Sequence, residues 1–514
     1  MCEQLKIVSI TNFVLEPFIS KYIGYYFGEL DTKVSLSSIE LMEYSCSQTL
    51  PKIASADMIF VAINFETLIP IFPEMGDQLE NMIEKCQESC EKLYAKLKEV
   101  SQKQILWLGF EDYYMKHSEI IGTTLSKESV VDRINQKLCN MMVDEDIVID
   151  LKRLIAYIGI SNSYDIKNKY RWNALYSEKL VGEICYEIQK QYKISNGLTP
   201  KCVVVDCDNV IWGGILSEDG IENIRISESG LGRQYWDFQR FLLYLYDHGV
   251  LISICSKNDE NEVHQVFKQH SGMVLKEDNI ACFCVNWNNK SENVKKIANE
   301  LNIGLDSIVF IDDSPYEVNE VSGRLPEVHT ILYRRDTIFR DLACFSLNKK
   351  VDPKINKMRN DTFRTNSERI KLKEKSKTEQ EFLSALKMNV VFNKTLSSEL
   401  SRVSELSQRT NKCTNGVRYT VEELRVLMKK PEYELQSVYL SDCYSNFGLV
   451  GVIGIDNGKL DLFCLSCRAL GRNIENKMIE CVMREGTKNA KLKKTQKNEE
   501  IIKLFSIYGL KYDK

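Results

Sequence analysis

Histidine is scarce in this chain, and its absence from long stretches limits the chemistry that we expect. The 514 residues include five histidines, none of them between positions 118 and 247 and none after His329. A serine or threonine nucleophile needs a neighbouring base, most often histidine, before it attacks a substrate. Thr11 and Asn12, which follow an apolar run near the start of the chain, lack such a base. We therefore expect no hydrolase catalysis in the first 195 residues.

Features of exported, membrane-spanning and nucleic-acid-binding proteins are also lacking. The first residues show no basic segment followed by an apolar one, and no apolar run reaches the ~18 residues that a membrane span needs. The net charge of −4 gives no reason to expect nucleic acid as a partner. We expect a cytoplasmic protein with no membrane partner. Its 17 cysteines are then reduced thiols, and the single C-x-x-C pair, Cys464 with Cys467, predicts no zinc site.

The length predicts about three domains, because a typical domain has ~150 residues. Residues 1–195 alternate short apolar runs with helical patterns, which is typical of an α/β domain. The turn-rich segment from Ser195 to Pro200 marks its end. The predicted strands cover 6–10, 58–64, 105–109 and 147–151, and the predicted helices cover 77–101 and 176–192.

Residues 196–346 repeat a strand-then-helix pattern, which predicts a parallel, Rossmann-like sheet. We interpret the polar stretch 347–378 as a linker with a helical segment, and 379–514 as a third domain of α+β type. In that domain, Asp456-Asn457-Gly458 has the composition of a hairpin turn. The strands of the second domain are predicted at 201–206, 250–255, 281–285 and 307–311, with helices at 233–248, 259–270 and 291–302.

Polar residues follow each predicted strand of the second domain. Asp206 and Asp208 end the first strand, Ser256 and Lys290 follow the next two, and Asp312 precedes Asp313 after the fourth. The carboxyl ends of parallel strands meet at one edge, so these groups should converge. Carboxylates that face one another repel unless a cation lies between them, and magnesium prefers oxygen ligands. The predicted metal ligands are Asp206, Asp208, Asp312 and Asp313.

This set is suited to phosphate chemistry. Asp206 can attack phosphorus, and Asp208 can act as a general acid and then as a base. Ser256 and Lys290 can hold the phosphate oxygens. The alternative is that each acid only caps the turn that follows it, which is common for a single aspartate.

The ordered set resembles the active site of the haloacid dehalogenase (HAD) superfamily. Within it, the chain resembles FkbH-like proteins of subfamily IIIC, through the stretches 208–214, 254–258, 311–315, 408–412 and 466–472. The resemblance implies a HAD-type core between an N-terminal degenerate SGNH-like domain and a C-terminal domain of the N-acetyltransferase (GNAT) type. It also implies that the substrate contacts Asn209, Trp212, Gly213, Gly214, Lys257 and Asn258.

FkbH-like proteins take a small phosphorylated acyl donor, 1,3-bisphosphoglycerate. They release its phosphate and load the glyceryl unit as a thioester onto the phosphopantetheine arm of an acyl carrier protein, in polyketide and related pathways. The resemblance implies that activity here. The alternative is a magnesium-dependent phosphatase that acts on a small phosphoester.

An acyl-carrying cysteine and a site for the pantetheine arm are further expectations. We favour Cys255, which lies beside Ser256, although neighbouring residues of a strand point to opposite faces. Cys467 is the second candidate, and Cys207 is expected to point away from the site. Backbone N–H groups at a helix start suit a phosphate, and the predicted pantetheine-binding residues are Arg468, Gly471, Arg472 and Asn473.

Overall fold

The computed structural model describes residues 4–30, 32–64, 77–101, 103–111, 127–143, 146–345, 353–376, 378–495 and 498–512. The chain forms two compact units, Met1–Ser195 and Asn196–Lys514. The first unit ends at the turn-rich segment that the sequence indicates. Among the described residues, no helix is both long and apolar enough to cross a membrane.

The first unit is built on a parallel five-stranded sheet in the order β2-β1-β3-β4-β5. Four of the strands match predicted ones, whereas β2 was not predicted because three serines interrupt its apolar residues. β5 is shorter than predicted, since the Asp150 side chain accepts a hydrogen bond from the Arg153 N–H and starts a helix there. The strands are β1 (Leu5–Thr11), β2 (Val34–Glu40), β3 (Met58–Ala62), β4 (Gln104–Leu108) and β5 (Ile147–Ile149).

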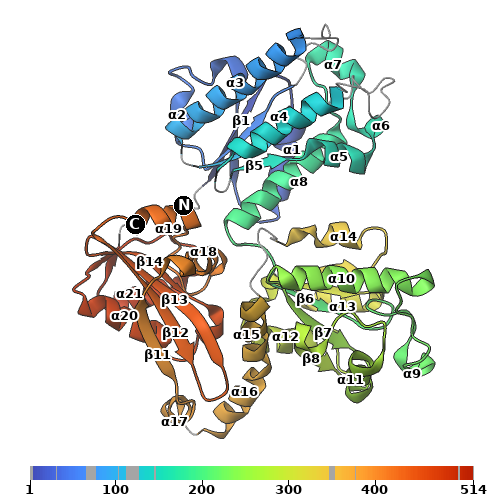
Figure 1. Ribbon diagram of the computed structural model, residues 1–514, viewed down its shortest axis with the longest axis vertical. Helices are drawn as coiled ribbons and strands as arrows, with labels where there is room; N and C mark the ends of the chain where they lie inside the picture. The colour runs from blue at the N-terminus through green and yellow to red at the C-terminus, as the bar shows by residue number, and fades with distance from the viewer. Residues whose placement is uncertain are drawn as a thin grey trace. The chain divides into compact units, whose positions relative to one another are not determined.

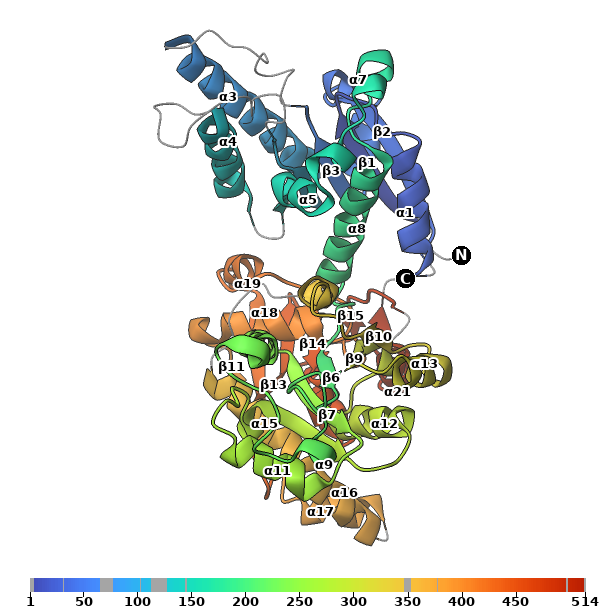
Figure 2. The same ribbon diagram turned by 90° about the vertical axis from the view of Figure 1, so that its right-hand side faces the viewer.

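Helices cover both faces of this sheet, each over its own apolar core (Figure 2). One face carries α1 (Phe18–Gly28), α5 (Leu151–Ile158) and α8 (Glu178–Ser195), and the other α2 (Leu50–Ala54), α3 (Asp77–Val100) and α4 (Lys127–Met141). The short helices α6 (Ile160–Ser163) and α7 (Ile166–Trp172) precede α8. At the carboxyl end of β1, Asn12 Oδ1 accepts a hydrogen bond from the Asn64 N–H at 2.7 Å. Asn12 thus joins two strand ends.

The second unit begins with another parallel sheet, in the order β10-β9-β6-β7-β8. Its strands β6, β7 and β8 are labelled in Figure 1. The four predicted strands and their shared carboxyl edge are confirmed, with ends that shift by at most one residue. The strands are β6 (Cys202–Val205), β7 (Leu251–Ser256), β8 (Ile280–Val285), β9 (Ile308–Asp312) and β10 (His329–Leu332). One face packs on α10 (Arg233–Asp247) and α11 (Glu260–Gln269), the other on α12 (Lys290–Leu301) and α13 (Pro315–Arg324).

A second sheet of six strands closes this unit. Its first four strands pair antiparallel, and the two short strands at its other edge pair parallel. The predicted hairpin turn is confirmed, because Asn457 and Gly458 both have positive φ, 48° and 75°. The strands are β11 (Asn389–Lys394), β12 (Tyr433–Ser441), β13 (Asn446–Asp456), β14 (Lys459–Leu465), β15 (Asn489–Ala490) and β16 (Lys511–Tyr512), and the helices are α18 (Leu400–Arg409), α19 (Val421–Leu427), α20 (Ile474–Arg484) and α21 (Glu499–Ile507).

The stretch 347–378 was interpreted as a linker with a helical segment; its described part is indeed helical, but it packs within the second unit. These are α15 (Pro353–Arg364) and α16 (Asn366–Lys375), and α17 (Glu379–Ala385) follows. Asn356 donates a hydrogen bond to the Tyr246 carbonyl oxygen at 2.8 Å, and Asn360 donates to the Asp278 carbonyl oxygen at 3.0 Å. Polar side chains therefore anchor these helices, which is why the low apolar content of the stretch was misleading.

Arg369 provides the strongest anchor, and its removal should destabilise the second unit. Its guanidinium forms a bidentate ion pair with Asp442, with 2.7 Å from Nε to Oδ2 and 2.9 Å from Nη2 to Oδ1. The Arg369 side chain is 2% exposed. Arg369→Met should lower the free energy of unfolding by ~3–5 kcal/mol, because Asp442 would stay buried without its partner. Denaturant unfolding measures this loss. Arg425→Met, which removes an exposed pair with Glu422, is the matched control and should cost less than about 1 kcal/mol.

Candidate active site

Lys290 joins two of the predicted acids at the carboxyl edge of the first sheet of the second unit. It is the first residue of α12, while Asp206 follows β6 and Asp312 ends β9. Its ammonium lies 2.9 Å from Asp206 Oδ2 and 2.5 Å from Asp312 Oδ2. All three residues are buried. The chain thus holds an ammonium between two carboxylates that come from positions more than 80 residues apart.

The cluster of Lys290 with Asp206, Asp312 and Asp313 contains three carboxyl groups and one ammonium. Asp206, Asp312 and Asp313 each offer a carboxylate oxygen, and these oxygens lie within 4.8 Å of one another. Asp206 Oδ1 is buried and has no hydrogen-bond partner among the described residues. Burial and the nearby Asp206 carboxylate raise the pKa of Asp312 to about 7. A cation would pair with the unbonded oxygen and offset this repulsion, so the residues fit a divalent metal ion.

Asp208 does not join that group, although we predicted it as a metal ligand. Its Oδ1 accepts hydrogen bonds from Trp212 Nε1 at 2.8 Å and from the Leu216 N–H at 3.1 Å. Its Oδ2 accepts one from Asn258 Nδ2 at 3.0 Å. Burial raises the pKa of Asp208 against the opposing effect of these bonds. β6 ends at Val205, so strand alternation does not set the direction of this side chain. A raised pKa suits a proton donor.

Ser256 shares a hydrogen-bond donor with Asp208, namely Asn258, whereas Lys257 takes no part in these bonds. Ser256 is buried at the end of β7, and Asn258 donates to its hydroxyl oxygen at 3.0 Å. Lys257 instead pairs with Glu317 of α13 at 2.7 Å. Glu317 was not predicted as a site residue, although its place in the first turn of α13, after Pro315, puts it at the same sheet edge.

The turn 209–214 contributes to the site mainly through its backbone conformation and packing. Asn209 has a φ of 54°, and its Oδ1 accepts a hydrogen bond from the Gly214 N–H at 3.1 Å. A Cβ at Gly213 would lie 2.4 Å from the Tyr235 ring, so only glycine fits there. Trp212, which we predicted to contact substrate, is fully buried and orients Asp208 through its indole N–H.

The structure contradicts the choice of Cys255 as the acyl-carrying residue. Its side chain is fully buried in the core on the α12 side of the sheet, opposite the face that holds Cys207. Burial raises the pKa of both thiols well above the ordinary value. A thiol that is neither exposed nor ionised is a poor nucleophile. Cys467, at the start of the 466–473 loop, is half-buried and remains a candidate.

Thiol alkylation tests this correction. In the native protein, iodoacetamide should label the exposed Cys46, Cys139 and Cys443, and it should leave Cys255 and Cys207 unlabelled until the protein is denatured. Peptide mass spectrometry of native and denatured samples gives the extent at each position. Native labelling of Cys255 as fast as that of Cys443 would restore it as a candidate nucleophile.

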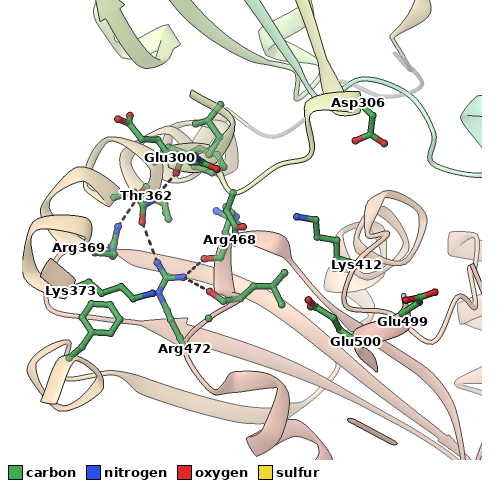
Figure 3. A pocket seen from close by; sticks show the side chains of 18 residues that line it. Glu300, Asp306, Thr362, Arg369, Lys373, Lys412, Arg468, Arg472, Glu499 and Glu500 are labelled. Atoms are coloured by element: carbon green, nitrogen blue, oxygen red, sulfur yellow. Dashed lines mark hydrogen bonds between the residues drawn. The ribbon is translucent and has the colours of Figure 1, made fainter. Parts of the chain in front are cut away.

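Three of the four predicted pantetheine-binding residues line a cavity of about 710 Å³ within the second unit (Figure 3). They are Arg468, Gly471 and Arg472, whereas Asn473 does not line it. The same cavity is also lined by Arg369 and Lys412, which were not predicted as site residues. Their positions, 43 residues apart on either side of the third predicted domain's start, gave no signal that they share a cavity.

Comparison with solved structures supports the fold. The chain is similar to the N-terminal part of protein BF1531 from Bacteroides fragilis, described as containing a phosphatase domain complexed with Mg. The TM-score is 0.59 at 23% identity, over 68% of this chain and 94% of that one. A lipase from a goat rumen metagenome matches with a TM-score of 0.30 at 13% identity, covering 37% of this chain and 97% of its own. Comparisons with family models and with curated proteins found no match.

Proposed function

We propose that this protein is a magnesium-dependent enzyme that removes phosphate from a small phosphorylated substrate. The observation that carries the proposal is the placement of Lys290 between Asp206 and Asp312, beside a buried Asp206 oxygen that accepts no hydrogen bond from the residues that the structure describes. The similarity in fold to a protein with a phosphatase domain complexed with Mg supports it. Magnesium would be held by Asp206, Asp312 and Asp313, and it would neutralise charge on the phosphate.

Four residues of the chain have separate roles in the proposed reaction. Asp206 attacks phosphorus, and the bond from phosphorus to the leaving oxygen breaks while Asp208 gives that oxygen a proton. Water then attacks the phosphorus of the aspartyl phosphate, and Asp208 takes the proton of that water. The products are inorganic phosphate and the starting carboxylate of Asp206. Lys290 and Ser256 hold phosphate oxygens during both steps.

The finer proposal is that the substrate is 1,3-bisphosphoglycerate and that Asp206 removes the phosphate of its phosphoester. The acyl phosphate at the other end reacts at its carbonyl carbon, where a thiol displaces phosphate as the leaving group, and the glyceryl unit reaches the pantetheine thiol of an acyl carrier protein. It rests on the resemblance of the stretches 208–214, 254–258, 311–315, 408–412 and 466–472 to FkbH-like proteins. The cavity beside Arg468 and Arg472 is a place where the carrier arm could bind. With Cys255 buried, either Cys467 carries the acyl group or the carrier thiol takes it directly.

One incubation separates the loading enzyme from a plain phosphatase. The protein is mixed with 1,3-bisphosphoglycerate, magnesium and a holo carrier protein. Released phosphate is measured, and the carrier is weighed by intact-protein mass spectrometry. The loading proposal expects phosphate together with a glyceryl increment on the pantetheine arm, and an apo carrier as control should gain none. Release of phosphate without any mass increment on the carrier would contradict the loading proposal, and the phosphatase activity alone would remain as the function.

A further inference from the structure

The helix α7 of the first unit buries none of its seven residues. Tyr170 and Trp172 are 74% and 69% exposed, and Ile166 is 38% exposed. Large apolar side chains that are exposed together, and not singly, mark surfaces that another molecule contacts. The helix therefore has the features of a contact surface.

Hydrogen bonds at both ends hold α7 in place. At its start, Asp165 Oδ1 accepts from the Asn168 N–H, and the Asp165 N–H donates to the Leu175 carbonyl oxygen, both at 2.9 Å. At its end, the Asn173 carbonyl oxygen accepts from the Val14 N–H at 2.9 Å. A helix of this length is unstable by itself in water, so these bonds explain its order where burial does not. The exposed side chains thus stand on a fixed backbone, which lowers the entropy cost of binding a partner.

The end of α7 lies at the carboxyl edge of the sheet of the first unit. Asn173 Nδ2 donates a hydrogen bond to the Asn12 carbonyl oxygen at 3.0 Å, and Asn12 directly follows β1. This is the edge at which α/β sheets bind their ligands. Since we expect no hydrolase catalysis in this unit, a surface at this edge can serve binding alone.

α7 is cationic within an acidic unit. The first 195 residues contain 21 lysines and arginines against 28 aspartates and glutamates, whereas α7 contains Lys167, Lys169 and Arg171 and no acid. Among the described residues, no ion pair involves Lys167 or Arg171. These two residues are four positions apart, as are Ile166 and Tyr170, so the two pairs lie side by side on one face of the helix. This face offers positive charge and apolar contact together.

The charge distribution favours an acidic protein over other anionic partners. A membrane surface or a nucleic acid extends well beyond a helix of seven residues, which is ~10 Å long, and would also meet the acidic remainder of the unit. A small protein can place one acidic patch against α7, and its charges more than ~8 Å from other acids are largely screened at physiological salt. Tyrosine, arginine and tryptophan, the last three residues of α7, are also the types that contribute most to binding at protein interfaces.

We propose that α7 docks the acyl carrier protein, through an acidic patch of that protein that meets Lys167 and Arg171 and an apolar contact at Tyr170. The choice of this partner rests on the proposed function, in which a carrier takes the glyceryl unit. The acidic and apolar chemistry of the partner rests on α7 itself. Asp206 and the other residues of the proposed reaction belong to the second unit, so changes in α7 should affect docking and no chemical step.

Calorimetric titration of the full chain with an acidic holo carrier protein tests the proposal. The affinity should be lower at high salt than at low salt, because screening weakens the attraction. Arg171→Glu and Tyr170→Ala should each weaken binding about tenfold or more, since the first reverses a charge and the second removes an apolar contact. Both side chains are exposed, so thermal unfolding of these variants should stay within about 5 °C of wild type. Lys52→Glu, which makes a matched charge reversal at an exposed position of α2, should bind as wild type does.

Phosphate release from a small phosphoester separates this proposal from the proposed function. Arg171→Glu should keep wild-type release but should need about tenfold more carrier for half-maximal glyceryl loading. Carrier binding that both α7 variants leave unchanged would overturn the docking site while the loading proposal stands. A wild-type protein that releases phosphate but binds no carrier would overturn docking and loading together. Anionic lipid vesicles and a single-stranded oligonucleotide are the remaining probes, and tighter binding of either one than of the carrier, lost in Arg171→Glu, would assign α7 to that partner instead.

Discussion

Asp206→Asn should reduce phosphate release at least about 1,000-fold, because an amide cannot act as the nucleophile that Asp206 supplies. The change removes a formal charge and keeps the shape of the side chain. Lys290 retains its 2.5 Å contact with Asp312, so the fold should persist. The measurement is phosphate released from an acyl phosphate or a phosphoester, in magnesium and under substrate saturation.

Two controls show whether the lost activity of Asp206→Asn comes from lost chemistry or from lost structure. Thermal unfolding of Asp206→Asn should stay within about 5 °C of wild type, which separates lost chemistry from lost structure. Asp237→Asn removes a half-exposed carboxylate of α10 that pairs with Arg233 at the surface, and it should retain full activity. Wild-type turnover in Asp206→Asn would remove Asp206 from its role as nucleophile.

Lys290→Met should reduce both activity and stability. The methionine leaves Asp206 and Asp312 facing each other with no ammonium between them. Removal of one partner from a buried charge cluster costs ~3–5 kcal/mol, and loss of a phosphate-holding cation slows the reaction about 100-fold or more. Denaturant unfolding in EDTA measures the first effect, and saturating magnesium should recover part of it.

The stability loss in Lys290→Met should also depend on pH. In the folded wild-type protein, burial and Asp206 already raise the pKa of Asp312 to about 7, above that of an unfolded aspartate. The unfolded state then releases its proton at lower pH than the folded state does. This acid therefore opposes folding increasingly as pH rises from about 4 to 7, and the variant should lose less stability near pH 5 than near pH 8.

Lys296→Met is the matched control for the Lys290 experiment, since it lies on the same helix and its exposed ammonium pairs loosely with Glu300 at 3.9 Å. It should cost less than about 1 kcal/mol and should show no such pH dependence. A loss in Lys290→Met that is independent of pH would mean that the destabilisation comes from packing and not from the facing carboxylates.

The sequence by itself determined where the proposed phosphate site lies. In a parallel sheet, the carboxyl ends of all strands share one edge, so Asp206, Lys290 and Asp312 had to converge once their strands were recognised. Apolar runs of four to six residues made that recognition straightforward. The hairpin at Asn457-Gly458 was equally predictable, because its backbone conformation is one that few other residue pairs adopt.

Tertiary structure decided the direction of each side chain and the partners that it meets. Asp208 lies beyond the end of β6, so no strand periodicity sets its orientation, and Trp212 and Asn258 hold it away from the metal group. Cys255 is the exception, because strand alternation, which the sequence already indicates, turns it away from Ser256 and into the core. The cavity of Arg468 and Lys412 depends on packing between segments that are distant in the chain, which local patterns do not encode.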